Sequence, residues 1–465
     1  MKKKYYIGLD QGTTGTTTLL LDETWNVVAR GYKEHTQYYP KPGWVEHDPL
    51  ELWQRVMESM SMALSEGGVS AEDVACIGID NQGETVMLWD KITGAPVYNA
   101  IVWQDRRMAR YADELTTEYG ELIREKTGLM ADSYFSGPKI KWIIDNVDGV
   151  KEKIKEGRVL AGTLDSWLIW KMTHGKVHVT DCSTASRTMM FNIHTGKWDD
   201  EILDILGISR SILPEICDSS MIYGYTDPLD FFGAKIPISG SVVDQQAALF
   251  GQACFAPGTI KCTYGTGCFM LMNTGEKPIY SSNGLLTTVA WRLNKKMTFA
   301  LDGGIYITGA ATQWLRDGIK IIDSAAQTEQ MAYDAKSNGG VYFVPAFAGL
   351  AAPHWDSYAR GTMVGITGGT TREHIVRATL ESTAYQVKDN LDVMNMDASM
   401  PISILRTDGG AVANNFLMQF QADILGIPVD VPVIKDTTPL GAAQLAALGI
   451  GEFDSIEDLA SHWKL

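Results

Sequence analysis

Near the N-terminus the chain reads Leu9-Asp10-Gln11-Gly12-Thr13-Thr14-Gly15-Thr16-Thr17, a short polar turn rich in glycine and threonine. Tyr5 to Leu9 before it is aromatic and β-branched, and Thr18 to Leu21 after it is apolar again. This pattern predicts a strand, a tight turn and a returning strand. The two glycines are expected to take unusual backbone angles, and the amides and hydroxyls of such a turn can bind an anion. Taken alone, the stretch fits an ordinary hairpin equally well.

A second stretch of the same kind opens the other half of the chain. Thr259 to Tyr264 predicts a strand, Gly265-Thr266-Gly267 a turn, and Cys268 to Met272 the returning strand. A third glycine-rich turn, Asp408-Gly409-Gly410-Ala411, follows an apolar run, and its small residues let the backbone come close to a flat ligand such as adenosine. Together these units indicate a duplicated fold with phosphate loops facing a cleft.

This arrangement resembles the actin/hexokinase-type (ribonuclease H-like) ATPase fold and, within it, the FGGY family of carbohydrate kinases. Tyr134-Phe135-Ser136-Gly137-Pro138-Lys139, continuing to Asn146, is similar to the family's first signature. Gly361-Thr362-Met363-Val364-Gly365-Ile366, continued by residues 374–381, is similar to its second. Tyr39 to Pro49 and Asn99 to Arg107 resemble the glycerol kinase branch of the family.

The resemblance implies an α/β protein of two actin/hexokinase-like domains facing each other across an ATP and substrate cleft. We expect residues 1–244 to form the N-terminal domain, which binds polyol and phosphate. We expect residues 245–465 to form the C-terminal domain, which binds the nucleotide. No flexible Ser/Pro linker separates the two, so they are expected to hinge directly on each other.

The resemblance also implies roles for individual residues. It makes Asp244 the general base that accepts a proton from the substrate hydroxyl. It places a small polyol against Gly83, Glu84, Trp103, Tyr134, Asp244, Gln245 and Phe269. It places ATP against Thr13, Thr14, Gly15, Thr266, Gly309, Gln313, Gly410, Ala411 and Asn414, and Mg²⁺, bound through water, near Asp10 and Asp244.

Considered without the resemblance, these positions have structural explanations as well. Glu84 follows a predicted buried strand and is either a solvated loop carboxylate or an acceptor for substrate hydroxyls. Trp103 and Tyr134 can pack in the core or face a polyol. Asp244, at a strand-to-helix junction, is by spacing an N-cap residue, and a capping residue can also face the cleft.

One aspartate and a cluster of three arginines elsewhere in the chain are expected to have structural roles. Asp165 is expected to cap the helix that follows the strand beginning near Leu160. Arg106, Arg107 and Arg110 are expected to begin a solvated helix face.

Composition limits the possible partners and location. A length of 465 residues predicts roughly two to three domains. A net charge of −16 argues against nucleic-acid or anionic-membrane partners. Six cysteines without metal-ligand spacing are expected to be buried, reduced thiols. No apolar run approaches the roughly 18 residues of a membrane span. We therefore expect a cytoplasmic protein without membrane insertion; a homo-oligomer is possible.

Two departures from the glycerol kinase pattern affect the expected substrate. Glycerol kinases carry an arginine just before the substrate glutamate, where this chain has Gly83, and a cation at the end of the first loop, where it has Thr17. Gly83 removes a forked donor and is expected to leave open space. The favoured function is ATP-dependent phosphorylation of glycerol to sn-glycerol 3-phosphate. Alternatives are a kinase for another small polyol or ketose (dihydroxyacetone, a tetritol or a pentitol) and a non-catalytic actin-like nucleotide-binding regulator.

Overall fold

The computed structural model describes residues 4–347, 349–354, 356 and 358–461, which form two compact units. Unit 1 contains residues 4–253, 288–299 and 437–461, and unit 2 contains residues 254–287 and 300–436. Residues 437–461, late in the chain, thus belong to the same compact unit as the N-terminal half. The expected domain boundary between residues 244 and 245 stays a prediction.

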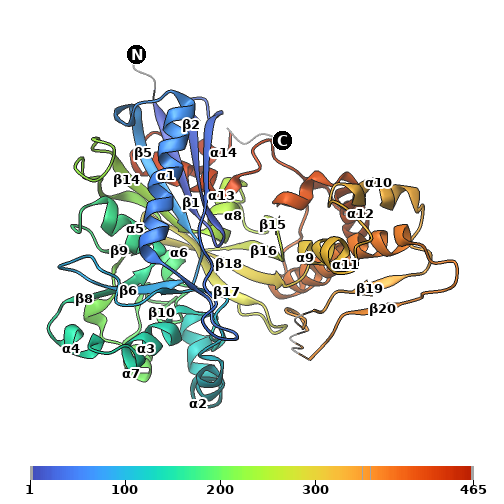
Figure 1. The fold of residues 1–465 in the computed structure, drawn as a ribbon, viewed down its shortest axis with the longest axis horizontal. Helices are drawn as coiled ribbons and strands as arrows, with labels where there is room; N and C mark the ends of the chain where they lie inside the picture. The colour runs from blue at the N-terminus through green and yellow to red at the C-terminus, as the bar shows by residue number, and fades with distance from the viewer. Residues whose placement is uncertain (1–3, 348, 355, 357, 462–465) are drawn as a thin grey trace. The chain divides into compact units, whose positions relative to one another are not determined.

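Unit 1 is built on a six-stranded sheet in the order β13-β14-β5-β1-β2-β3 (Figure 1). β1 and β2 form an antiparallel hairpin, and β5 and β14 run parallel to β1. The polar turn therefore lies at the edge where β5 and β14 end, which is where ligands bind in open α/β sheets. The strands are β1 (Tyr5–Gln11), β2 (Gly15–Asp22), β3 (Val27–Glu34), β5 (Val74–Asn81), β13 (Ser220–Tyr225) and β14 (Pro237–Val243).

Helix α13 (Thr437–Gly449) packs on this sheet although it comes from late in the chain (Figure 1). Gly8, Gly78 and Gly240 stand in register on β1, β5 and β14. A Cβ atom on these glycines would lie 1.8, 1.8 and 2.6 Å, respectively, from backbone atoms of α13. Because only glycine permits this approach, the row of three glycines seats the helix.

The other face of the sheet carries the main apolar core of unit 1. Ile7, Leu9 and Ile77 pack there with residues of α1 (Pro49–Gly67) and α5 (Leu164–Met172). Both ends of α1 are capped. The Asp48 carboxylate accepts a hydrogen bond from the Leu50 amide at 2.8 Å, and Gly68 ends the helix with a φ of 62°.

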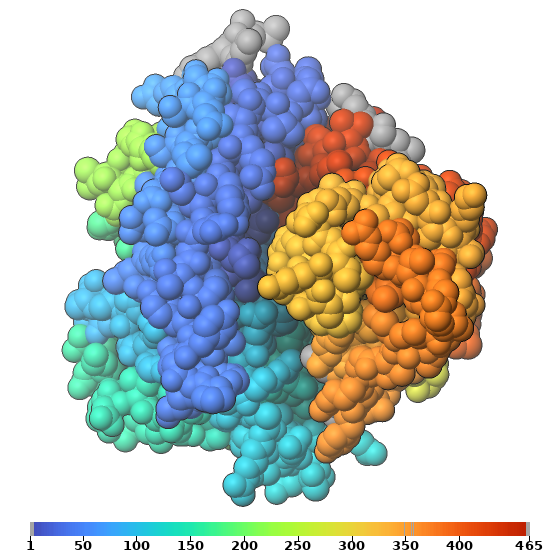
Figure 2. Space-filling view, turned by 45° about the vertical axis from the view of Figure 1, so that its right-hand side comes forward, coloured from blue at the N-terminus to red at the C-terminus, as the bar shows by residue number. Residues whose placement is uncertain are grey.

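Smaller elements complete unit 1. Helix α2 lies on its surface (Figure 2, cyan). The smaller sheets are β4-β7-β6-β8, β10-β11 and β12-β9. Their strands are β4 (Glu46–His47), β6 (Val86–Asp90), β7 (Ala100–Ile101), β8 (Val159–Thr163), β9 (Val179–Asp181), β10 (Phe191–Asn192), β11 (Lys197–Trp198) and β12 (Glu215–Cys217). The remaining helices are α2 (Ala109–Thr127), α3 (Ser136–Asn146), α4 (Val150–Lys155), α6 (Cys182–Ala185), α7 (Asp200–Leu206), α8 (Asp244–Gly251), α14 (Ile456–Ala460), η1 (Ala71–Asp73) and η2 (Arg210–Ile212).

Unit 2 repeats the same central motif. Its sheet has the order β17-β18-β16-β15-β21-β22, with β15 and β16 antiparallel and β21 parallel to β15. The strands are β15 (Ile260–Tyr264), β16 (Cys268–Gly275), β21 (Leu405–Asp408) and β22 (Val429–Asp430), together with β17 (Leu286–Leu293) and β18 (Lys296–Ile305), whose residues 288–299 are grouped with unit 1. The other elements are α9 (Gly309–Gln313), η3 (Trp314–Gly318), α10 (Gln327–Asp334), β19 (Tyr342–Val344), β20 (Thr362–Val364), α11 (Arg372–Ala398), η4 (Gly410–Ala413) and α12 (Asn415–Leu425). The duplicated strand–turn–strand units predicted from the sequence are present.

Two further expectations concern the chain as a whole. The six cysteines are buried and free, as expected. Among the described helices, none combines the length and apolar character that crossing a membrane requires.

Candidate active site

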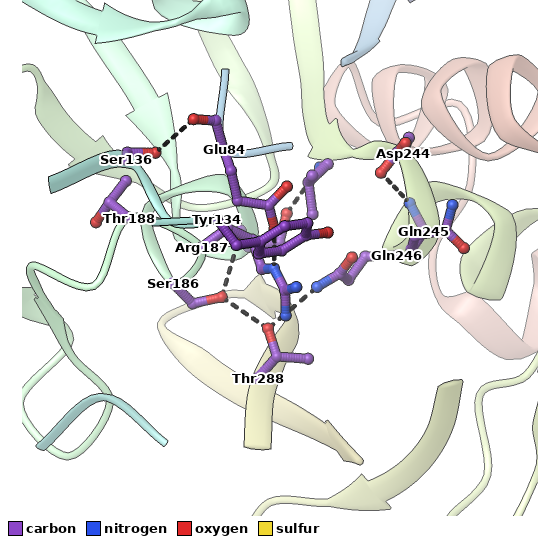
Figure 3. A network of polar contacts seen from close by, with 12 residues as sticks. Glu84, Tyr134, Ser136, Ser186, Arg187, Thr188, Asp244, Gln245, Gln246 and Thr288 are labelled. Carbon is purple, nitrogen blue, oxygen red and sulfur yellow. Dashed lines mark hydrogen bonds and ion pairs between the residues drawn. The ribbon is translucent and has the colours of Figure 1, made fainter. Parts of the chain in front are cut away.

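Glu84 is the centre of a buried polar cluster in unit 1 (Figure 3). It follows β5 in a tight turn with a φ of 59°, a backbone conformation that is rare outside glycine. Its carboxylate oxygen Oε1 accepts a hydrogen bond from Nε of Arg187 at 2.6 Å. Glu84 is 3% exposed, so the solvated loop carboxylate that the sequence left open is wrong.

Burial changes the charge balance around Glu84. It raises the pKa of Glu84 to about 7, although the Arg187 guanidinium works in the opposite direction. Burial also lowers the pKa of Lys139, on α3, to about 7 against the attraction of the Glu84 carboxylate. Both groups therefore change protonation near neutral pH, the range in which a site can use them.

Trp103 and Tyr134 line the same cluster. Their rings meet edge to face with centroids 5.8 Å apart. The Trp103 indole Nε1 donates a hydrogen bond to Oγ1 of Thr13 at 2.8 Å. The indole thus connects the first phosphate loop to the residues around Glu84, which core packing alone does not require.

Gly83 has one close neighbour. A Cβ atom at this position would lie 2.9 Å from Cγ2 of Val243. The valine that precedes Asp244 therefore crowds the first side-chain atom of any larger residue at position 83, and the open volume expected beyond it stays a prediction.

The first phosphate loop is closed by its own backbone. The Gly12 amide donates to the Gly15 carbonyl at 3.0 Å, and neither glycine has a positive φ, so the expectation of unusual angles is wrong. Gly15 is needed for space instead, because a Cβ atom there would lie 2.7 Å from the Tyr32 ring. Gln37 donates from Nε2 to the Thr13 carbonyl at 2.8 Å and supports the loop from the side. Thr14 is exposed.

Three carboxylates gather where β1, β5 and β14 end. The strand register pairs Asp10 directly with Asp80, and it pairs Asp80 with Val242, two residues before Asp244. Asp80 is fully buried, and burial raises its pKa well above the usual range, reinforced by the charges of Asp10 and Asp244. Such a concentration of oxygen ligands and negative charge fits a hard divalent cation. No three His, Cys, Asp or Glu side chains of the described residues are arranged as a direct metal site.

Asp244 itself is the first residue of α8, not its N-cap. Val243 occupies the N-cap position, and the Asp244 carboxylate oxygen Oδ1 accepts from the adjacent Gln245 amide at 2.7 Å. The next residue, Gln246, donates from Nε2 to Oγ1 of Thr288 at 3.2 Å (Figure 3). The predicted cap is thus displaced by one residue, and the carboxylate is held by the first turn of the helix.

In unit 2 the second phosphate loop rests on α9. The Thr266 carbonyl accepts hydrogen bonds from the amides of Thr308 and Ala310, both at 3.0 Å. A Cβ atom on Gly309 would lie 2.5 Å from the Gly265 carbonyl oxygen, so this position must be glycine. The structure therefore brings Thr266 and Gly309 together, while Gln313 lies exposed at the end of the helix.

The third glycine-rich turn follows β21. Gly409 has a φ of 90°, whereas a Cβ atom on Gly410 would meet nothing within 4 Å. Gly410 and Ala411 begin η4, and Asn414 caps α12 by accepting from the Leu417 amide at 3.0 Å. Phe269, expected against the polyol, lies on β16 of unit 2.

Comparison with known proteins identifies the family. Residues 5–251 match the N-terminal domain of the FGGY family of carbohydrate kinases, and residues 260–450 match its C-terminal domain. The chain belongs to this family. The fold class and the kinase class expected from the sequence are thereby confirmed for this FGGY kinase.

Individual relatives of this FGGY kinase are glycerol kinases. "Glycerol kinase 2" of Thermotoga maritima is 61% identical over 463 residues, which are 99% of this chain and 93% of the relative. The glycerol kinase of Caldanaerobacter subterraneus is 56% identical with the same coverage. The crystal structure of Plasmodium falciparum glycerol kinase with ADP has a TM-score of 0.91 at 39% identity, covering 99% of this chain and 92% of that one.

Sequence reasoning missed Arg187, Lys139 and Asp80 of this FGGY kinase. Arg187 interrupts a run of small and apolar residues between Ala185 and Phe191, and Lys139 lies inside the first signature. These weak signals could have marked them. Asp165 does not cap α5, because it accepts instead from the hydroxyls of Thr163 and Thr180.

Arg107 was expected on a solvated face and is buried. It pairs with Glu46 at 2.7 Å and with Asp105 at 2.8 Å. Its guanidinium carbon lies 3.8 Å from the ring centroid of Trp44 and 4.4 Å from that of Trp142. The expectation of a solvated face is therefore wrong for Arg107.

Proposed function

We propose that this FGGY kinase transfers the γ-phosphate of ATP to a terminal hydroxyl of glycerol and releases sn-glycerol 3-phosphate and ADP. The observation that carries the proposal is the buried Glu84 carboxylate, held by Arg187 beside Trp103 and Tyr134. A buried acceptor next to aromatic faces suits a small polyol, since the carboxylate binds hydroxyls and the rings pack on carbon. The named relatives are glycerol kinases over nearly the whole chain.

Asp244 would act as the general base. It would accept the proton of the attacking hydroxyl as the bond to the γ-phosphorus forms, and Gln245 would help to orient the polyol. Its place in the first turn of α8 keeps the carboxylate from rotating freely. Phosphoryl transfer needs mainly such positioning, together with charge neutralisation.

We propose ATP contacts from residues of each unit. Thr13, Thr14 and Gly15 of unit 1 and Thr266 of unit 2 would bind the phosphates. Gly309, Gln313, Gly410, Ala411 and Asn414 would hold the nucleoside. Asp10 and Asp244 would bind Mg²⁺ through water, and Mg²⁺ when bound neutralises charge on the phosphates. We place the reaction in the cytoplasm, in line with six free thiols.

The surroundings of Gly83 leave a second substrate class in competition with glycerol. A methyl carbon of Val243 would lie 2.9 Å from a Cβ atom at position 83, which restricts this position at its first side-chain atom only. The alternative of a kinase for a tetritol, pentitol or ketose therefore stays a competing proposal.

An ADP-release screen over glycerol, dihydroxyacetone, glyceraldehyde, tetritols and pentitols tests the function. We expect glycerol to have the highest kcat/KM and Asp244→Asn to abolish most of the turnover. A higher kcat/KM for any other compound would reassign the substrate. ADP release independent of all polyols would overturn the kinase proposal.

A pair of variants tests the role of Gly83. Gly83→Arg alone should lower kcat/KM for glycerol, because the new Cβ meets Val243. The double variant Gly83→Arg/Val243→Gly should recover at least part of this loss. Equal effects of the single and double variants would show that the contact with Val243 is unimportant.

A further inference from the structure

The backbone of Glu84 is held in an unfavourable conformation by a buried lysine. A φ of 59° is strained for a glutamate and persists only where surrounding contacts enforce it. The Glu84 carbonyl oxygen accepts from the Ser136 hydroxyl at 3.2 Å and from Nζ of Lys139 at 3.3 Å. Both donors come from the first turn of α3. These two hydrogen bonds thus fix the backbone from which the Glu84 side chain extends.

The same lysine also holds Tyr134. Nζ of Lys139 donates to the Tyr134 carbonyl as well as to that of Glu84. Lys139 has no exposed surface, and a buried ammonium is unfavourable unless it is paired or bonded. One buried lysine therefore ties together the backbones of two residues expected to touch the polyol.

Arg187 holds the carboxylate end of the Glu84 side chain. The Arg187 guanidinium donates to the carboxylate, and its central carbon lies 5.8 Å from the ring centroid of Tyr134 and 5.6 Å from that of Phe135 (Figure 3). Arg187 is 5% exposed, and Glu84 is 3% exposed. A charge-assisted hydrogen bond in such surroundings is strong and directional.

We propose that Lys139 and Arg187 are positioning residues of the polyol site, which together hold Glu84 and Tyr134 in the geometry that binds substrate. Lys139 fixes the two backbones, and Arg187 binds the Glu84 carboxylate while its guanidinium faces the Tyr134 ring. Gly83, next to Glu84, offers no side chain that could bind the carboxylate. Arg187 donates to it instead. The inference rests on the proposed function and names the residues that make its site.

The charges around Glu84 set the pH midpoint of substrate binding, a quantity that a purely structural role of Arg187 would not change. The charged groups that face the carboxylate are Arg187 after α6, Lys139 of α3 and Asp244 of α8. Arg187 and Lys139 lower the pKa of Glu84, and Asp244 raises it. Removing Arg187 should therefore move the pH midpoint of substrate binding upward from about 7.

The experiment measures kcat and KM for glycerol and for ATP between pH 6 and pH 9. Arg187→Gln should raise the KM for glycerol by about 10- to 150-fold, the loss of one charge-assisted hydrogen bond. It should leave the KM for ATP within about twofold and shift the midpoint upward. Arg187→Lys keeps the charge, so it should keep the midpoint and recover part of the KM. Lys139→Met should raise the KM for glycerol in the same direction.

Arg107→Gln is the matched control. Arg107 is an equally buried arginine of unit 1 that pairs with Glu46 and Asp105. Its loss should lower the melting temperature without changing the KM for glycerol or the pH midpoint. Wild-type turnover of glycerol decides the proposed function, and the ratio of variant to wild type decides the role of Lys139 and Arg187. A KM for glycerol within twofold of wild type in Arg187→Gln, or an unshifted midpoint, overturns the inference. If Arg187→Gln does not fold, an unchanged KM in both Arg187→Lys and Lys139→Met overturns it.

Discussion

The β1–β2 hairpin of unit 1 and the β15–β16 hairpin of unit 2 are two versions of one motif. Each closes a short Gly/Thr turn, and each has a parallel strand beside its first strand. The register makes Thr263 and Asp408 of unit 2 the counterparts of Asp10 and Asp80 of unit 1. The same backbone therefore carries two carboxylates in one unit and one in the other.

The segments after the two parallel strands differ more. β5 ends at Asn81 and leads into Gln82, Gly83 and Glu84, whereas β21 leads into Gly409, Gly410 and Ala411. Long polar side chains can perform acid–base chemistry and bind hydroxyls, while small residues expose the backbone to a flat ligand. The comparison suggests that unit 1 works through its side chains and unit 2 through its backbone. This difference can be tested.

The largest effect is expected from a side chain of unit 1. Asp244→Asn should lower turnover by about two to four orders of magnitude, the range for a positioned base, while ATP binding stays nearly intact. Steady-state kinetics and calorimetric titration with ATP measure the two quantities. A variant that keeps more than a tenth of the wild-type rate would remove Asp244 from this role.

A backbone change should have the next largest effect, in unit 2. Gly409 has a φ of 90°, and a Cβ atom there would lie 2.4 Å from the Tyr264 carbonyl oxygen. Gly409→Ala should weaken ADP binding by about 1–3 kcal/mol, the usual strain at such a position. Gly368→Ala, elsewhere in unit 2, is the control, because a Cβ atom at 368 meets nothing within 4 Å. Equal affinities of the two variants would contradict a backbone-based site.

The third prediction concerns pH and a side chain of unit 1. Because the pKa of Glu84 is raised to about 7, its carboxylate is ionised above this pH and protonated below it. The ionised form is acceptor-only and charged, whereas protonation turns one oxygen into a donor and removes the charge. The KM for glycerol should therefore rise as pH falls below 7, by about tenfold per pH unit. Glu84→Gln should bind glycerol weakly at every pH, and a KM that is constant between pH 6 and pH 8 in the wild type would refute the assignment.

The smallest effect is expected from the hydrogen bond between Thr13 of the first phosphate loop and Trp103, which is expected to contact the polyol. Trp103→Phe keeps an aromatic face but removes the hydrogen bond to Thr13. We expect ATP affinity to weaken by about 0.5–1.5 kcal/mol, the net value of one hydrogen bond. Thr13→Val removes the same bond together with a hydroxyl proposed to bind phosphate, so the double variant should lose no more than Thr13→Val alone. Additive losses would show that the bond does not couple the two residues.

Much of the fold could be predicted from local patterns. Short apolar runs around Gly/Thr turns predict hairpins, and Asp48 and Gly68 mark the ends of α1. The place of α13 could not be predicted. Its residues are mostly buried, so no polar face indicates which sheet it covers. The three glycines that seat it are spread over more than half of the chain, and only the strand register shows them as one row.

The site was predictable only in part. Glu84 and Asp244 stand at strand ends and match the motifs of a known family. Arg187 is 103 positions from Glu84, and no periodicity connects them. Arg107 was misjudged because a cluster of arginines usually lies in water, whereas here Trp44 and Trp142 cover its guanidinium. Long-range pairing of charges inside a core leaves little trace in local sequence.

The seating of α13 on the unit 1 sheet also has a consequence for how the protein is made. The sheet that carries Asp10, Asp80 and Asp244 packs against a helix that leaves the ribosome only after all of unit 2 has been synthesised. Until then, the glycine row on β1, β5 and β14 is without its helix, and the apolar surface beside it is exposed. Unit 2 can complete its core first, so the half of the enzyme that holds the proposed base is the last to be finished.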